Sequence, residues 1–206
     1  MTGLVAQYGY LAVFAIIGIE SLGIPLPGET TLIAAAIYAG ATHHLNIVWV
    51  IVAASAGAIV GDNIGYVIGY FGGYRLLVRY GRYIRLDEPR IKIARYLFLR
   101  YGGEVVVYGR FTAILRAYAA FLAGTTRMHW RRFVVFNATG GILWSAVYGT
   151  AAYVLGRHVD TISRPLGIGF AVVGATAIVA GFLFIRRQEG RLGKLAEKAF
   201  PGPLTD

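Results

Sequence analysis

Five charged side chains lie inside stretches of sequence that are otherwise apolar. They are Glu20, Glu29, Asp62, Arg110 and Arg116. A charge at the centre of a membrane helix costs roughly 2.5–3.5 kcal/mol, so such residues mark functional sites or pair with one another. Arginine binds phosphate oxygens through a planar, permanently charged fork. We therefore expect Arg110 and Arg116 to bind a phosphate group, with the three acids carrying protons or neutralising the arginines. Without a bound phosphate, the arginines would pair with Glu20 or Glu29.

The composition indicates a chain that lies in lipid. Of its 206 residues, 57% are hydrophobic and 15% are charged, whereas a soluble domain carries about 25% charged residues. Cysteine is absent, which excludes a disulfide scaffold and a cysteine-ligated metal site. The net charge of +10 is typical of nucleic-acid binding only when the charges gather on one folded face. Here they form separate clusters between apolar blocks, so we expect no nucleic-acid partner.

The positions of the basic residues predict the orientation in the membrane. Residues 1–74 contain no lysine or arginine, and the basic residues gather at 75–100, 127–132 and 186–198. Between them lie blocks that are long enough to cross, or half-cross, a hydrocarbon core needing roughly 20 helical residues. These blocks are 3–41, 45–74, 102–126, 133–156 and 165–185. Because basic loops stay on the cytoplasmic side, we expect a multi-pass plasma-membrane protein with its basic loops and C-terminus in the cytoplasm.

Two of the apolar blocks cannot cross the membrane once. Block 102–126 has a basic cluster on each side, so it must enter and leave on the cytoplasmic side. Block 3–41 is too long for one span, and Pro25, Pro27 and Gly28 would break a helix near its centre. If its first half crosses outward, its second half must dip back in from the outside.

These constraints predict the fold class. We expect an all-α, polytopic integral membrane protein with two opposed re-entrant helical hairpins, at about 21–41 and 102–126, in an inverted repeat. Residues 1–189 would form this transmembrane domain and residues 190–206 a cytoplasmic tail. Segment 75–100 interleaves eight basic residues with aromatic and aliphatic ones, which predicts an amphipathic helix or helix pair in the cytoplasmic interface.

A ladder of small residues surrounds Asp62. It repeats every four positions and comprises Ala53, Gly57, Gly61, Gly65, Gly69 and Gly73. Such a stripe permits close packing of helices in lipid. An acid on this face could pair with an arginine across the helix contact, and we favour that structural role for Asp62 over a role as transport ligand. Asn137 and Trp144 are expected to pack in a matching way on 133–156.

Four groups of residues, in this order and spacing, resemble the DedA family of membrane proteins, also called the SNARE-associated or VTT-domain family. The groups are Glu20 to Glu29 with its Pro-Gly-Glu motif, Gly61-Asp62-Asn63-Ile64-Gly65-Tyr66, Gly109-Arg110-Phe111 with Arg116 and Ala123-Gly124, and Met128, Phe133, Asn137 and Trp144. The similarity extends from about residue 8 to 156. One departure is that Ala113 and Ala120 stand where family members usually carry proline. We therefore expect the second re-entrant segment to turn without proline, near Arg116.

The resemblance implies a role in moving lipids across membranes, as a flippase or scramblase linked to the proton motive force. The lipids would be polyprenyl phosphates such as undecaprenyl phosphate, or phospholipids such as phosphatidylethanolamine. The functional acids of the family correspond here to Glu20 and Glu29, and its functional arginines to Arg110 and Arg116. The partners would then be membrane lipids and protons, with a homo-oligomer left open.

Two other classes of function are weighed against lipid transport. A proton-coupled cation or drug antiporter would share the acids and the re-entrant segments, and its arginines would only tune the acids. A membrane-embedded lipid phosphatase or transferase would normally show a nucleophilic histidine or a metal-binding acid cluster, and the sequence has neither. We therefore expect no enzyme activity, no cofactor and no metal.

The two acids of the first re-entrant segment are expected to differ. Glu29 begins a helix, where the helix dipole stabilises a carboxylate, whereas Glu20 ends the preceding helix, where the dipole disfavours one. Glu20 would then be the better proton carrier. The pH dependence of transport should shift in Glu20→Gln and stay close to that of the wild type in Glu29→Gln. The opposite result, with only Glu29→Gln insensitive to pH, would reverse the assignment.

Overall fold

The computed structural model describes residues 2–24, 26–80, 88–110, 113–157 and 198–199, and the elements in these ranges are helices without any strand. The helices are α1 (Thr2–Ser21), α2 (Gly28–Thr42), α3 (Ile47–Tyr80), α4 (Glu88–Tyr101), α5 (Glu104–Gly109), α6 (Ala113–Thr125) and α7 (Trp130–Arg157). The expected all-α fold class is confirmed for this part of the chain. The predicted span 165–185 and all but two residues of the tail 190–206 lie outside the described residues.

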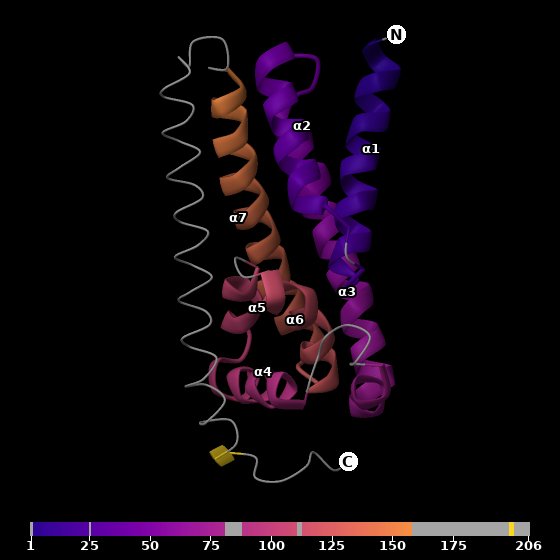
Figure 1. Ribbon diagram of the computed structural model, residues 1–206, viewed down its shortest axis with the longest axis vertical. Helices are drawn as coiled ribbons and strands as arrows, with labels where there is room; N and C mark the ends of the chain where they lie inside the picture. Colours follow the sequence, from indigo (N-terminus) through magenta and orange to yellow (C-terminus); the bar gives the residue numbers. More distant parts are fainter. Residues whose placement is uncertain (1, 25, 81–87, 111–112, 158–197, 200–206) are drawn as a thin grey trace.

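Two helical hairpins enter the molecule from opposite ends (Figure 1). Helices α1 and α2 form the first hairpin, which opens toward the end where α3 begins. Helices α5 and α6 form the second, which opens toward the end where α4 lies crosswise. The tips of both hairpins lie in the middle part of the molecule, where α1 contacts α6. Helices α3 and α7 run past both tips and complete the bundle.

The position of the first hairpin's turn differs from the expected one. We expected the helix over 3–20 to reach the far side before residues 24–41 turned back, but the turn at 22–27 lies inside the molecule. The helix lengths explain the difference. At 1.5 Å per residue, the 20 residues of α1 span about 30 Å and the 34 residues of α3 span about 51 Å. Helix α1 therefore ends partway along α3.

Several contacts between helices correspond when the first three helices are exchanged with the last three, although the contacts of α2 with α3 and of α1 with α6 have no counterpart among the main helix contacts of the described residues. Helix α1 packs along α3 as α5 packs on α7, and α2 packs on α7 as α6 packs on α3. Helices α3 and α7 also pack on each other. Each hairpin thus sends one helix to its own long helix and the other to the long helix of the opposite half.

The small-residue ladder on α3 is the surface on which both hairpins pack. A Cβ atom on Gly57 would overlap the carbonyl oxygen of Phe14 in α1, and one on Gly69 would overlap that of Phe121 in α6. Gly61 meets the backbone of Gly18 in the same way. One half of the ladder therefore serves α1 and the other half α6, as the four-residue spacing predicted.

The contact between α2 and α7 uses a second pair of glycines. A Cβ on Gly40 would overlap the backbone of α7 at Tyr153, and one on Gly156 would overlap the backbone of α2 at Ile37. Trp144 is 2% exposed and fills the core between α2, α3 and α7 with Leu32, Val50 and their neighbours. These backbone approaches are possible because no side chain separates the helices.

The outer surface of the bundle is strongly apolar. Phe71 is 82% exposed, and large apolar side chains on every long helix are open to the surroundings. Within the described residues, one helix, Ile47–Gly72, is both long and apolar enough to cross a membrane, with a mean hydropathy of 1.8. An exposed apolar area of this extent marks a surface that contacts lipid or another protein.

The basic segment 75–100 divides into the end of α3 and the crosswise helix α4 (Figure 1). Phe98 and Lys92, both residues of α4, are buried, while Arg100 is exposed. The Nη1 atom of Arg100 donates a hydrogen bond of 2.9 Å to the hydroxyl of Tyr96, and this bond raises the pKa of Arg100. The segment is therefore amphipathic in its described part, with an apolar side that faces the bundle.

The ladder gives a test with an internal control. Gly69→Ala should lower the free energy of unfolding by about 1–3 kcal/mol, because the new methyl group overlaps a helix carbonyl that cannot move aside. Gly65→Ala should be neutral or stabilising by up to about 1 kcal/mol, because a Cβ there meets Ala120 Cβ at 3.6 Å. Thermal unfolding in detergent measures both. Equal stability of the two variants would contradict the packing described.

Candidate functional site

A buried network of three side chains joins α3, α5 and α7. The guanidinium of Arg110 donates from Nη2 to Oδ2 of Asp62, forming a salt bridge, and also to Oδ1 of Asn137. The Nδ2 atom of Asn137 in turn donates to the carbonyl of Ile59, at 3.3 Å. Arg110 and Asp62 are each 4% exposed and Asn137 is fully buried. A charge pair removed from water to this extent is held by its own hydrogen bonds.

Two glycines on α7 make room for the arginine. A Cβ on Gly140 would lie 3.0 Å from Cδ of Arg110, and one on Gly141 would lie 3.5 Å from Cζ. They follow Asn137 at helical spacings of three and four, so the amide and both glycines share one face of α7. Sequence reasoning assigned Asn137 only to packing and missed Gly140 and Gly141. Their spacing from Asn137 was the available signal.

The guanidinium retains one free donor. Among the described residues, Nε of Arg110 is buried without a hydrogen-bond partner. Buried donors are nearly always paired in folded proteins, so an unpaired one calls for an explanation. An oxygen atom of a bound ligand would accept a hydrogen bond from this Nε.

The partner of Arg110 differs from the one expected for the lipid-free state. We expected it to pair with Glu20 or Glu29, and the structure pairs it with Asp62. The reason is the position of Asp62 on α3. It follows Gly61, and successive helical residues point about 100° apart, so the ladder faces α1 while Asp62 faces α5 and α7. The expected pairing of Asp62 with an arginine across a helix contact is confirmed.

The carboxylate of Glu20 lies against the first turn of α2. A Cβ on Gly28 would overlap its Oε2 atom, so the absence of a side chain at Gly28 lets the carboxylate approach the backbone. The N-terminal end of a helix favours a negative charge. This corrects the argument that the C-terminal end of α1 governs Glu20, because the long side chain reaches the start of the next helix. Glu29, the second residue of α2, is half-buried.

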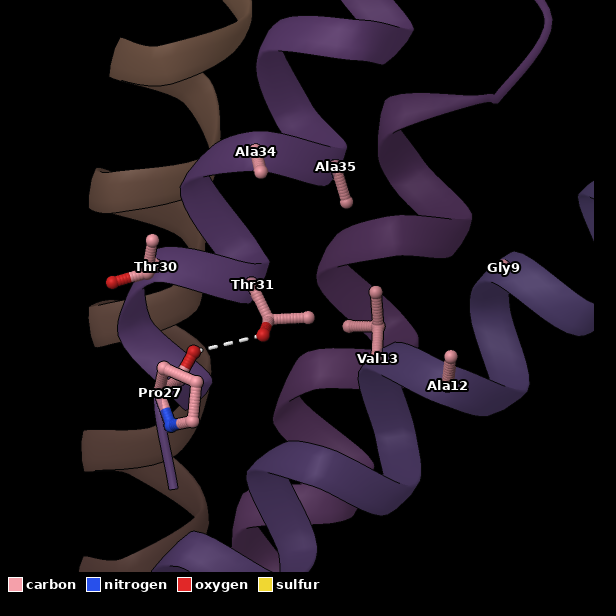
Figure 2. Close-up of a pocket in the computed structure, with 8 residues that line it drawn as sticks. All are labelled: Gly9, Ala12, Val13, Pro27, Thr30, Thr31, Ala34 and Ala35. Atoms are coloured by element: carbon pink, nitrogen blue, oxygen red, sulfur yellow. Dashed lines mark hydrogen bonds between the residues drawn. The ribbon is translucent and has the colours of Figure 1, made fainter. Parts of the chain in front are cut away.

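A groove between α1 and α2 runs beside this turn (Figure 2). Its volume is about 350 Å³, and it is lined by Gly9, Ala12, Val13, Pro27, Thr30, Thr31, Ala34 and Ala35. The side chains of Val13 and Thr31 face each other across it, and the hydroxyl of Thr31 is occupied by a hydrogen bond of 2.8 Å to the carbonyl of Pro27. The lining is therefore nearly apolar and suits hydrocarbon better than a charged group.

The turn of the second hairpin lies earlier in the chain than expected. Arg116 and Ala117 are inside α6, which begins at Ala113. Alanine is the strongest helix former, so Ala113 and Ala120 allow an unbroken helix where prolines would limit it. The side chain of Arg116, like Pro25 of the first hairpin, lies outside the described residues.

The remaining predicted residues lie at helix contacts. Gly124 allows α6 to approach the backbone of α3 at Tyr66, and Gly65 faces Ala120 of α6. Trp144 lies 5.8 Å from Tyr148, measured between ring centroids. The structure thus brings together Asp62, Arg110 and Asn137, and separately Glu20 and Gly28.

A charged pair buried between long apolar helices, inside a bundle with an apolar exterior, defines the class of helical integral membrane proteins. A model of the VTT domain matches residues 26–154, and the chain belongs to this family. It is 45% identical to a membrane protein of Mycobacterium tuberculosis over 190 residues, which cover 90% of this chain and 87% of that one. It is 31% identical to protein DedA of Escherichia coli over 211 residues, with 94% and 91% covered.

A membrane protein of Synechocystis is 37% identical over 193 residues, which cover 90% of this chain and 88% of that one. No solved structure matches the chain. The resemblance to the DedA family drawn from the sequence is therefore confirmed, and the protein is a membrane protein of this family.

The salt bridge between Asp62 and Arg110 can be tested by a double-mutant cycle. Asp62→Ala should lower the free energy of unfolding by about 3–5 kcal/mol, because it leaves a buried guanidinium without its counter-ion. Asp62→Ala combined with Arg110→Met should cost less than the sum of the single changes, by about 1–3 kcal/mol. Glu104→Ala, at an exposed acid, is the control and should change stability by at most about 0.5 kcal/mol. Additive effects would show that the pair is not coupled.

Proposed function

We propose that this protein moves phosphate-bearing lipids across the bilayer as a flippase or scramblase. The candidate lipids are polyprenyl phosphates such as undecaprenyl phosphate, and phospholipids such as phosphatidylethanolamine. The observation that carries the proposal is Arg110, a buried guanidinium between the hairpin and both long helices that retains an unpaired Nε. A phosphate oxygen is the strongest partner available to such a group.

In the proposed mechanism the lipid phosphate replaces Asp62 as the counter-ion of Arg110, and Arg116 supplies a second positive charge. Protonation of Asp62 would weaken its hold on the guanidinium and favour this exchange. Glu20 and Glu29, at the tip of the other hairpin, would take up and release protons along the same path. The groove between α1 and α2 would hold part of the lipid chain, since its lining is nearly apolar. The carboxylate of Asp62 would then link substrate binding to proton uptake, because it binds either Arg110 or a proton.

The topology belongs to the same proposal. The two hairpins would be re-entrant segments of an inverted repeat, which the exchangeable contacts of the two halves support. The end of the molecule that carries α4 would face the cytoplasm, because its helix is basic and amphipathic. The protein would then be a multi-pass protein of the plasma membrane, without an enzyme activity of its own.

A proton-coupled cation or drug antiporter is the second candidate. It is favoured by the burial of Arg110 and by its bonds to Asp62 and Asn137, since a guanidinium that never meets substrate would look the same. In that case the arginine only sets the charge state of the nearby acid. The two candidates differ in whether lipid movement depends on the fork geometry of the arginine.

Reconstitution into liposomes with a headgroup-labelled lipid separates them. Arg110→Lys keeps the charge that Asp62 needs but loses the planar fork. Losing one charge-assisted hydrogen bond, worth about 1.5–3 kcal/mol, should slow lipid movement by about ten- to a hundredfold. Arg116→Ala should also slow it, and Glu20→Gln should shift its pH dependence. Arg131→Lys, at an exposed position, is the matched control.

The outcome that contradicts lipid transport is equally specific. If the wild-type protein moves neither phospholipid nor polyprenyl phosphate, with or without a proton gradient, the lipid proposal is wrong. Proton-driven cation uptake into the same liposomes would then support the antiporter. Normal lipid movement in Arg110→Lys would exclude bidentate phosphate binding at this residue.

A further inference from the structure

A second hollow lies where the turn between α6 and α7 meets α3, and we call it the α6–α7 pocket. Its volume is about 420 Å³, and it is lined by Tyr66, Val67, Tyr70, Phe71, Arg127, Met128, His129 and Trp130. Figure 1 places this turn at the end of the molecule that carries α4. The pocket lies outside the network around Arg110 and shares no residue with it.

Arg127 of this pocket has a backbone conformation that favours glycine. Arg127 has a φ of 52°, in the left-handed region that is unfavourable for L residues. It closes the end of α6, with its own N–H bonded to the carbonyl of Gly124 at 2.9 Å and the N–H of Met128 bonded to that of Ala123 at 3.0 Å. Glycine is the usual residue at this position of such a helix ending. The side chain of Arg127 is therefore not explained by the turn.

The wall of the pocket is a fixed stack of aromatic rings. Tyr66 stacks on Phe133 at 4.6 Å and on Tyr70 at 6.1 Å, and Tyr70 meets Phe71 edge-on at 5.4 Å, all between ring centroids. The hydroxyl of Tyr66 donates to the carbonyl of Met128 and so ties the turn to α3. These contacts hold the aromatic wall of the pocket against the turn.

The charges around the pocket are positive. The guanidinium of Arg127 lies 5.4 Å from the ring centroid of Tyr70 and is exposed. The lining contains no acidic residue, and Arg131 and Arg132 follow on α7 as exposed residues. Trp130 donates from Nε1 to Asn63 at 3.2 Å, which holds the indole at the rim. The pocket therefore places the positive charge of Arg127 beside aromatic rings, some of which carry a polar hydroxyl or N–H group.

The surface beside the pocket is apolar. Phe71 is 82% exposed and Val67 45%. Tryptophan and tyrosine gather at the level of lipid headgroups in membrane proteins, and basic residues there attract anionic lipids. Positive charge on one side and exposed apolar surface on the other fit a molecule with an anionic phosphate and a hydrocarbon chain.

We propose that the α6–α7 pocket binds the headgroup of an anionic phospholipid, with the phosphate at Arg127 and a chain along Val67 and Phe71. This is a lipid site at the surface of the bundle, separate from the transport path proposed at Arg110, and it does not depend on that proposal. It accounts for an arginine in a left-handed conformation beside an aromatic wall. The chosen ligand for its test is phosphatidylglycerol.

His43 provides a matched control at the other end of the molecule. It ends α2 as Arg127 ends α6, also with a positive φ, of 57°. Replacing either residue by glycine relieves the same unfavourable backbone conformation. Arg127→Gly and His43→Gly should therefore both fold at least as stably as the wild type, and only the first should affect the pocket.

The test uses quenching of tryptophan fluorescence by brominated lipids in reconstituted vesicles. All proteins carry Trp49→Phe, so that the signal comes from Trp130 at the pocket and from the buried Trp144. Quenching by brominated phosphatidylglycerol is compared with quenching by brominated phosphatidylcholine. One arginine near the surface contributes about a fivefold preference for the anionic lipid. The preference should therefore fall about fivefold in Arg127→Gly, to the level set by the neighbouring Arg131 and Arg132, and persist unchanged in His43→Gly.

Two results would overturn the proposal. An unchanged preference in Arg127→Gly would show that the arginine does not bind the headgroup. Displacement of the lipid by an excess of inorganic phosphate alone would show a site for free anion instead. Because binding is read without transport, loss of lipid movement with the preference intact would count against the proposed function and leave this site standing.

Discussion

The close approach of α3 to both hairpins is the constraint on which the rest of the structure depends. Gly57 and Gly61 bring the backbone of α1 against α3, and Gly69 and Gly124 do the same for α6. Because the two contacts lie on successive parts of one helix, α1 and α6 approach each other beside Gly61 and Gly65, which flank Asp62 in sequence. In lipid, where apolar surface gains little from burial, such backbone packing is a main source of helix association.

The buried charges follow from this packing. Asp62 is placed by α3, Arg110 by the end of α5, and Asn137 by α7, so the network exists only when all three elements are assembled. Gly140 and Gly141 leave the space that the arginine occupies. A buried pair contributes little net stability but is costly to break, which makes its retention more consistent with a functional role than with a purely structural one.

The charged and apolar features lie in two regions of the molecule. One region holds the buried guanidinium of Arg110 and, between α1 and α2, an open and nearly apolar groove. The other region, at the α4 end, holds aromatic rings and exposed arginines. Both halves of the bundle end their second hairpin helix in a left-handed residue, His43 or Arg127. Of the two, only Arg127 is permanently charged, and it lines the α6–α7 pocket. The two halves therefore share a framework and differ in chemistry.

The sequence by itself determined the helical fold class, the family, the four-residue ladder of α3 and the charged residues of the interior, because composition, periodicity and motifs are local properties. It predicted the first turn at the correct residues but not its depth in the molecule, because apolar length does not say where a hairpin lies along its neighbour. It placed the second turn near Arg116, which lies inside α6. It named Asp62 as a partner for an arginine but also expected Arg110 to pair with Glu20 or Glu29, and it missed Gly140 and Gly141. Only the tertiary structure decided which acid meets the arginine, since that depends on the rotation of α3 against α5 and α7.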